Sequence, residues 1–187
     1  ITHSFSKNLA KQTLDRFDIK GNILVIAPVT NWRRKNWPME NYSKLIKKLM
    51  LSETLKFNKI LLLGSKEEYN ECELLKKKIR SQNVINFAGK LDILVIYEII
   101  KRSKLFVGND SGLMHLSAAS GTKTLGLYGP SREQNYSPWG TNSFFIRTSK
   151  NYGELVGTEG YNRHDTSSLM NSLDVKDVYD KCLTIIN

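Results

Sequence analysis

The sequence lacks long hydrophobic runs: no stretch approaches the roughly 18 to 20 consecutive apolar residues of a membrane-spanning helix. Its first residues, ITHSFSKNLAKQTLDRF, also lack the apolar centre of a signal peptide. There are only two cysteines, Cys72 and Cys182, and neither belongs to a CxxC motif or a Cys/His cluster. We therefore expect a cytoplasmic chain with reduced thiols and no metal site.

Acidic residues are few relative to basic ones. Lys and Arg number 28 and Asp and Glu 18, which gives a formal net charge of +10. Such a chain should attract anions, for example nucleotides, phosphorylated lipids or nucleic acid. Many of the lysines lie in runs such as KLIKKL and LLKKKIR, where they alternate with apolar residues at helical spacing. Because this pattern is typical of a solvated helix face, the charge by itself leaves the ligand class open.

Short apolar runs recur along the chain and are separated by amphipathic stretches of helical length. Most of these runs are unbroken by polar residues, which is typical of strands that are covered on both faces. They are residues 23–28, 59–64, 83–89, 104–110 and 124–130. One helical stretch follows Pro38, and another follows the candidate N-cap Asp92. This alternation predicts an α/β fold, with a Rossmann-like parallel sheet and helices on both faces.

The remaining segments should frame this sheet. With 187 residues, 40% of them hydrophobic, the chain can fill one core but not two large ones. Residues 1–20 read as a linker or lead-in helix, and residues 21–187 as the domain itself. A closing helix is expected over residues 174–186. Residues 147–172 show no clear period and are expected to form a long surface loop.

Polar residues follow the fourth apolar run in the sequence GNDSGLMH, residues 108–115. In an open parallel sheet, ligands bind at the carboxyl ends of the strands, where the loops enter helices. Asp110 or Ser111 can cap such a helix, and Gly112 leaves room for a ligand. The helix N–H groups could then bind a diphosphate, with Ser111 and His115 on one face. The alternative is an ordinary capped helix that carries a surface histidine.

The loop after the first run mixes basic and aromatic side chains. Arg33, Arg34 and Lys35 lie between Trp32 and Trp37. Such a mixture could stack on nucleic-acid bases, but a stacking groove usually draws on several elements, and this is one short loop. We favour an interpretation in which Lys35 binds phosphate, the two arginines face solvent, and Trp37 packs against the following helix.

Two acidic residues, Glu67 and Glu68, open the helix that is predicted after the second run. Acids in a first turn are favourable beside the positive end of the helix dipole, which is one interpretation. The other is that one of them accepts hydrogen bonds from ribose hydroxyls, as acidic residues do in dinucleotide-binding folds. Both interpretations remain open at this point.

Four motifs, taken in order, resemble a known family. They are KNWP (35–38), GSKEE (64–68), GNDSGLMHLSAASGT (108–122) and YGPSREQNYSPWG (128–140). Together they resemble the C-terminal domain of ADP-heptose:lipopolysaccharide heptosyltransferases, which form glycosyltransferase family nine. The resemblance covers about residues 20–146, and its most specific part is D-S/T-G-x-x-H followed by (F/Y)GP. It implies the C-terminal half of a GT-B fold, in which two Rossmann-like domains face each other across a cleft.

The C-terminal domain of that family binds the ADP-sugar donor, and the resemblance assigns positions here. Lys35 matches a lysine that neutralises donor phosphate, with Thr30 and Asn31 beside the same group. Glu68 matches an acid that binds the nucleoside at its ribose, and Leu91 falls beside the adenine. The residues that match those around the diphosphate and heptose are Asp110, Ser111, Gly112 and His115.

The resemblance also implies a reaction. A heptose, or a related sugar, passes from an ADP-sugar to a lipopolysaccharide core acceptor, with inversion, after a general base activates the acceptor hydroxyl. The ADP-sugar is a substrate, so neither a cofactor nor a metal is implied. The family location is the cytoplasm, including peripheral association with the cytoplasmic face of the inner membrane.

The chain begins with Ile1 rather than methionine, and we expect it to be cut from a longer protein. The catalytic base and the site for a lipopolysaccharide core or lipid-linked acceptor would then lie in an N-terminal domain absent from this sequence. By itself, this fragment should bind the donor without catalysing transfer.

Two other functions fit parts of the sequence. One is another GT-B enzyme, such as a UDP-sugar transferase or a UDP-N-acetylglucosamine 2-epimerase. Those enzymes often place a glutamate after the glycine-containing turn, where this sequence has His115. The other is a non-catalytic anion-binding or nucleic-acid-binding module, which predicts a basic stripe away from the strand carboxyl ends and steep salt dependence. We do not expect nucleic acid as a partner.

Overall fold

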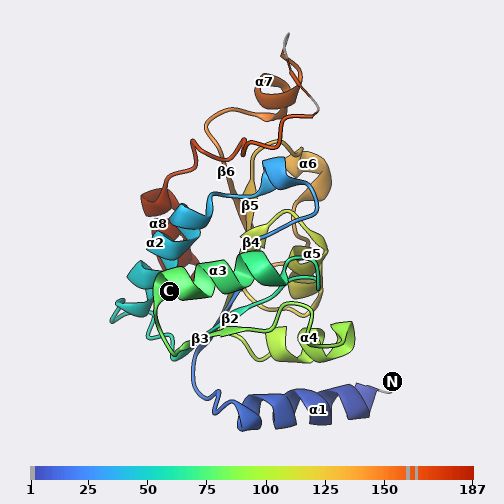
Figure 1. The fold of residues 1–187 in the computed structure, drawn as a ribbon, viewed down its shortest axis with the longest axis vertical. Coiled ribbons are helices and arrows are strands. Elements are labelled where there is room, and N and C mark those ends of the chain that lie inside the picture. Colours follow the sequence, from blue (N-terminus) through green and yellow to red (C-terminus); the bar gives the residue numbers. More distant parts are fainter. Residues whose placement is uncertain (1–2, 159–160, 163) are drawn as a thin grey trace.

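The computed structural model, which describes residues 3–158, 161–162 and 164–187, is an α/β fold built on one parallel sheet (Figure 1). The strand order in this part of the chain is β3-β2-β1-β4-β5-β6. The strands are β1 (Ile23–Ala27), β2 (Lys59–Leu62), β3 (Val84–Asn86), β4 (Leu105–Asn109), β5 (Thr124–Tyr128) and β6 (Ser143–Arg147). The prediction of a Rossmann-like parallel sheet is therefore confirmed.

Strand β6 was not predicted. It pairs only with β5 and lies at the edge of the sheet, so its residues are half-buried or exposed. Its sequence, SFFIR, is a short apolar run between polar residues and carries a weaker signal than the fully buried runs. Phe145 packs edge-to-face on Tyr128 of β5, with ring centroids 5.9 Å apart.

Helices cover both faces of the sheet, as expected. One face is covered by α2 (Met39–Met50), α3 (Tyr69–Ile79) and α8 (Val175–Ile186), and the other by α1 (His3–Arg16), α4 (Ile93–Ile100) and α5 (Gly112–Ala119). Side chains alternate between the two cores along β1: Leu24 and Ile26 enter one, and Val25 and Ala27 enter the other. Asp92 caps α4 as predicted, and its carboxylate accepts a hydrogen bond from the Leu94 N–H at 2.9 Å.

The two ends of the chain pack onto this framework. Helix α1 lies along α4 at the lower edge in Figure 1 and buries Ala10 and Leu14. The predicted closing helix is α8, which begins after the N-cap Asp174. Across the described residues, no helix is both long enough and apolar enough to span a membrane.

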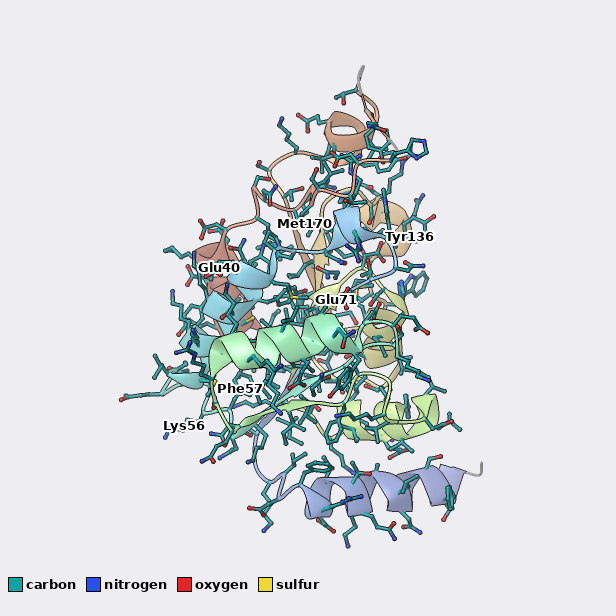
Figure 2. The ribbon with its side chains drawn as sticks, in the orientation of Figure 1. Glu40, Lys56, Phe57, Glu71, Tyr136 and Met170 are labelled. Carbon is teal, nitrogen blue, oxygen red and sulfur yellow. The ribbon has the colours of Figure 1, made fainter. Side chains whose placement is uncertain are left out.

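Residues 147–172 differ from the predicted surface loop. The segment contains the short helix α7 (Tyr152–Val156), and its Met170 is fully buried (Figure 2). An added Cβ at Gly129 would collide with the Met170 sulfur, so the glycine of the YGP motif makes room for this side chain. The prediction failed because Met170 is the one buried hydrophobic residue among the described residues of a segment without a period, and periodicity is what identifies buried segments from sequence.

Candidate functional site

The strand order reverses direction between β1 and β4, and this is where an open parallel sheet binds ligands. Ala27 and Gly108 are paired neighbours at the carboxyl ends of these two strands. An added Cβ at Gly108 would lie 3.0 Å from the Cβ and carbonyl oxygen of Ala27, so a glycine permits this close approach. The loops after β1 and β4 therefore leave the sheet side by side.

An open cleft of about 830 Å³ lies at this edge, between the loops that follow β1, β2, β3 and β4. Its volume falls in the range of small-molecule sites, roughly 300–1,000 Å³. Seven of the nine residues named from sequence line it: Thr30, Asn31, Glu68, Leu91, Asp110, Ser111 and Gly112. The other two residues are Lys35 and His115. They lie near different oxygens of the Asp110 carboxylate, Lys35 near Oδ2 and His115 near Oδ1.

Asp110 is the centre of the charged part of the site. It is only 6% exposed, and its Oδ2 lies 2.6 Å from the Lys35 Nζ. The His115 Nε2 lies 3.9 Å from Oδ1 of the same carboxylate, which is too long for a hydrogen bond, and His115 is exposed. Lys35 comes from the one-turn helix η1 (Arg33–Lys35), and His115 from the first turns of α5. Two basic side chains from different elements, η1 and α5, thus lie near one acid.

Helix α5 begins at the cleft with an unusual N-terminus. Ser111 occupies the N-cap position with extended backbone, but its side chain makes no capping hydrogen bond. Its Oγ is buried and has no hydrogen-bond partner among the residues that the structure describes. An added Cβ at Gly112 would meet no described atom within 4 Å. Gly112 and Leu113, the first two residues of α5, line the cleft, which is the placement that an anion-binding helix N-terminus requires.

Glu68 lies at the other end of the cleft. Its Oε2 accepts a hydrogen bond from the Ser65 N–H at 2.7 Å. Partial burial raises the pKa of Glu68, while that hydrogen bond opposes the shift. Gly64 leaves space for this carboxylate, because an added Cβ would lie 2.7 Å from Oε2. Helix α3 begins at Tyr69 with Glu68 as its N-cap, so Glu67 and Glu68 lie just before the first turn rather than within it.

Aliphatic side chains form the wall between these two polar ends. Sequence reasoning named only Leu91 of this group, which also includes Ile93, Ile96, Leu113 and Leu116. The signal in the sequence was the helix ILVIYEII, which is apolar at nearly every position and therefore exposes apolar side chains such as Ile93, at 53%. Gly89, at φ +68°, lets the loop after β3 approach the one after β2, because its added Cβ would lie 2.5 Å from the Lys66 Cα.

Asn109 connects the loops behind the site through hydrogen bonds. It was not identified from the sequence as a site residue. It is fully buried at the end of β4. Its Nδ2 donates to the Pro28 carbonyl at 2.8 Å, and its Oδ1 accepts from the Trp37 N–H at 3.1 Å and the Tyr42 hydroxyl at 3.0 Å. Burial raises the pKa of Tyr42 well above its usual value, so this hydroxyl stays protonated as a donor. The signal was a lone amide at the end of an otherwise apolar strand.

The loop after β1 is only partly as predicted. Trp37 is fully buried and packs edge-to-face on Tyr42 of α2, with ring centroids 5.0 Å apart, as expected. Its burial removes one of the two aromatics that a base-stacking surface would need. Arg33 faces solvent, but the prediction for Arg34 is wrong: this side chain is buried. The cause is a segment from far along the chain that covers it.

Thr30 and Asn31 differ in their surroundings. Thr30 is nearly buried, and its N–H donates to the Asn36 Oδ1 at 2.8 Å while its hydroxyl faces the same acceptor at 2.9 Å. Asn31 is exposed. Thr30 therefore helps to shape the loop that carries Lys35. Within the described residues, no group of three or more His, Cys, Asp or Glu side chains is arranged to hold a metal ion.

Comparison with known proteins places this site in context. A family model described as glycosyltransferase family 9 (heptosyltransferase) matches residues 2–159, a longer stretch than the sequence motifs covered. Lipooligosaccharide heptosyltransferase 2 of Haemophilus influenzae is 27% identical over 155 residues, covering 78% of this chain and 43% of that protein. Lipooligosaccharide heptosyltransferase 2 of Campylobacter jejuni is 33% identical over 108 residues, covering 56% and 32% respectively. The chain therefore spans less than half the length of these relatives.

Solved structures show the same fold. The structure of the E. coli ADP-heptose lps heptosyltransferase II superposes with a TM-score of 0.77 at 20% identity, covering 95% of this chain and 50% of that one. A glycosyl transferase family 9 protein from Veillonella parvula superposes with a TM-score of 0.82 at 17% identity, covering 97% and 51%. Both likenesses extend over nearly the whole of this chain and about half of the longer one.

Proposed function

This chain belongs to glycosyltransferase family 9, and on that premise we propose that it is the donor-binding domain of a heptosyltransferase. Its cleft would bind an ADP-sugar, and the whole protein would transfer heptose, or a related sugar, to a lipopolysaccharide core acceptor. The observation that supports this most is the placement of Lys35 and the open N-terminus of α5 around Asp110, at the reversal point of the sheet. Such a placement suits a diphosphate, which carries negative charge and accepts N–H hydrogen bonds.

Each end of the cleft would bind a different part of the donor. The diphosphate would lie at the N–H groups of Gly112 and Leu113, with the buried Ser111 hydroxyl, unpartnered among the described residues, as a further donor. The nucleoside would extend along the aliphatic wall toward Glu68, whose carboxylate would accept hydrogen bonds from the ribose hydroxyls. The wall offers an apolar surface to a purine, with Leu91 beside it.

The chemistry of this half is electrostatic. When the bond between the sugar and the diphosphate breaks, negative charge grows on the leaving ADP. Lys35 and the N-terminus of α5 would stabilise that charge, since preorganised donors aimed at developing charge lower the barrier. Before the donor binds, Lys35 is paired with Asp110. The bound diphosphate would therefore share the Lys35 ammonium with the Asp110 carboxylate. His115 would hydrogen-bond the phosphate or the sugar rather than act as the base.

The acceptor side is proposed from the family alone. The relatives act in lipooligosaccharide or lipopolysaccharide assembly by their names. We infer that the acceptor of the whole protein is a lipopolysaccharide core or a lipid-linked sugar. The base that activates its hydroxyl would come from outside this domain, and the enzyme would act in the cytoplasm, at the inner face of the membrane.

Calorimetric titration with ADP and with UDP tests the proposal. The domain should bind ADP more tightly than UDP, and Lys35→Ala should weaken ADP binding about 10- to 100-fold, the usual effect of losing a charge-assisted hydrogen bond. Arg33→Ala is the matched control, because it removes a positive charge two residues away from an exposed position. Preference for UDP would favour another GT-B enzyme. Unchanged ADP affinity in Lys35→Ala would remove Lys35 from the phosphate site.

A further inference from the structure

Arg34 is buried beneath a segment that lies far away in the sequence. The crossing segment (residues 161, 162 and 164–169) runs over the loop after β1 on its way to α8 (Figure 1). Arg34 is only 5% exposed. Its Nη1 donates to the Asn162 carbonyl at 2.6 Å, and its guanidinium carbon lies 4.6 Å from the centre of the Tyr161 ring. Its Nη2 lies 3.5 Å from the Asp165 Oδ2.

The same segment also holds the backbone on both sides of Lys35. The Leu169 N–H donates to the Arg34 carbonyl at 3.0 Å. The Ser168 hydroxyl donates to the Asn36 carbonyl at 2.6 Å. The next residue of the chain, Met170, is fully buried and anchors the segment to the core. The carbonyl groups before and after Lys35 are thus both bonded to one distant piece of chain.

Lys35 needs such support because its own element is weak. Helix η1 is a single 3-10 turn, and its N-cap Trp32 makes no side-chain capping hydrogen bond to any described residue. Isolated 3-10 turns have poor hydrogen-bond geometry. The Lys35 ammonium must nevertheless reach the Asp110 carboxylate across the sheet reversal, and a functional side chain is held in place only when its supporting residues are locked.

We propose that Arg34 is a positioning residue for Lys35, and that it fastens the phosphate-binding loop to the crossing segment. This inference rests on the proposed function, because it gives Lys35 its role toward the donor diphosphate. Arg34 is not part of the cleft lining, and its side-chain hydrogen bond and ion pair go to the crossing segment. It acts through the backbone of its neighbour. The crossing segment consequently sets the geometry of the phosphate site from 128 residues further along the chain.

Arg33 provides the matched control for this proposal. It lies in the same turn and carries the same charge, but its side chain is 70% exposed and only 3.7 Å from the Glu71 carboxylate. Arg34→Gln and Arg33→Gln therefore remove the same charge from adjacent positions. Arg34 is bound to the crossing segment, whereas Arg33 lies beside Glu71 of α3. Arg34→Lys and Asp165→Asn are milder changes at the anchor, for use where Arg34→Gln unfolds the domain.

A double-mutant cycle on ADP binding separates positioning from general stability. Arg34→Gln should weaken ADP binding about five- to tenfold, and Arg33→Gln less than about twofold, a difference within the usual range of coupling between neighbouring residues. In a Lys35→Ala background, Arg34→Gln should cause almost no further loss, because the residue through which it acts is gone. Equal losses in both backgrounds would show that Arg34 only stabilises the fold and would overturn the proposal.

Hydrogen exchange without ligand tests the same link independently of nucleotide binding. In Arg34→Gln, peptides that contain Lys35 and peptides that contain Tyr161 and Asp165 should exchange faster together, while both stay protected in Arg33→Gln. Unchanged protection around Lys35 would overturn the proposal. If the wild-type domain fails to bind ADP, the proposed function falls, and the exchange comparison still decides whether Arg34 holds this loop.

Discussion

The Lys35 ammonium and the Asp110 carboxylate lie 2.6 Å apart, across the point where the order of strands reverses. Lys35 comes from the loop after β1, and Asp110 directly follows β4. The pair therefore connects the two loops at the carboxyl edge of the sheet. Because Asp110 is nearly buried and Lys35 only partly exposed, the pair is screened less by solvent than a surface ion pair. A bound diphosphate must share Lys35 with this acid.

Asp110→Asn should separate the two parts of the donor. The change keeps the shape of the side chain but removes a negative charge beside the proposed diphosphate site. ADP should bind at least as tightly as before, because Lys35 is released from the carboxylate, whereas an ADP-sugar should lose affinity because the sugar would lose a charged acceptor. Calorimetry with ADP and with ADP-heptose measures both. Equal losses for the two ligands would mean that Asp110 only orders the loop.

Gly112→Ala should affect binding more than stability. The added methyl group meets no described atom, and alanine favours a helix more than glycine does, so the free energy of unfolding should change by less than about 1 kcal/mol. ADP affinity should nevertheless fall, since the methyl group projects where the diphosphate would approach the N–H groups of α5. Urea unfolding and calorimetry measure the two effects. Full ADP affinity in this variant would place the phosphate elsewhere.

Gly89→Ala should affect stability more than ADP binding. Gly89 has φ +68°, and its added Cβ would lie 2.5 Å from the Lys66 backbone. The strained backbone and the collision should lower the free energy of unfolding by about 1–3 kcal/mol. Urea unfolding of the two glycine variants side by side gives the comparison. If Gly89→Ala is as stable as the wild type, the close approach of the two loops is not needed for folding.

Asn109→Ala should destabilise the domain more than Tyr42→Phe. Removing the amide leaves the Pro28 carbonyl and the Trp37 N–H buried without their partner, and each such group costs about 1–3 kcal/mol. Tyr42→Phe removes only the third bond, so its expected loss is about 1 kcal/mol. Equilibrium urea unfolding at one pH measures both values. The reverse order would show that the Asn109 bonds do not hold the loops together.

The two cysteines should be unreactive in the folded protein. Burial raises the pKa of both Cys72 and Cys182 to about 12, so the thiols stay protonated at pH 8 and the reactive thiolate is depleted roughly a thousandfold. Thiol reagents should therefore label neither residue until denaturant is added, and then label both. Thr141→Cys, at an exposed position, is the positive control. Rapid labelling of the native wild type at pH 8 would contradict this.

Much of the fold could be predicted because its signals are local. The runs ILVIA, ILL and LGLY contain no charged residue, and each forms the buried part of a strand. The polar residues that follow strands meet at one edge simply because parallel strands end together. For this reason Lys35 and Asp110, 75 residues apart, could be assigned to one site from the sequence alone. The edge strand β6 escaped because half-burial weakens the pattern.

The amino-acid sequence by itself determined the alternation of strands and helices, the family and the residues that gather at the strand ends, since period, spacing and motif are properties of neighbouring residues. Only the tertiary structure decided that Arg34 is covered rather than solvated, that Asn109 ties Pro28 to Trp37, and that Met170 fills the space beside Gly129. Each of these depends on how segments far apart in the chain pack against each other. Local propensity and periodicity carry no information about such contacts, so they could be learned only from the folded molecule.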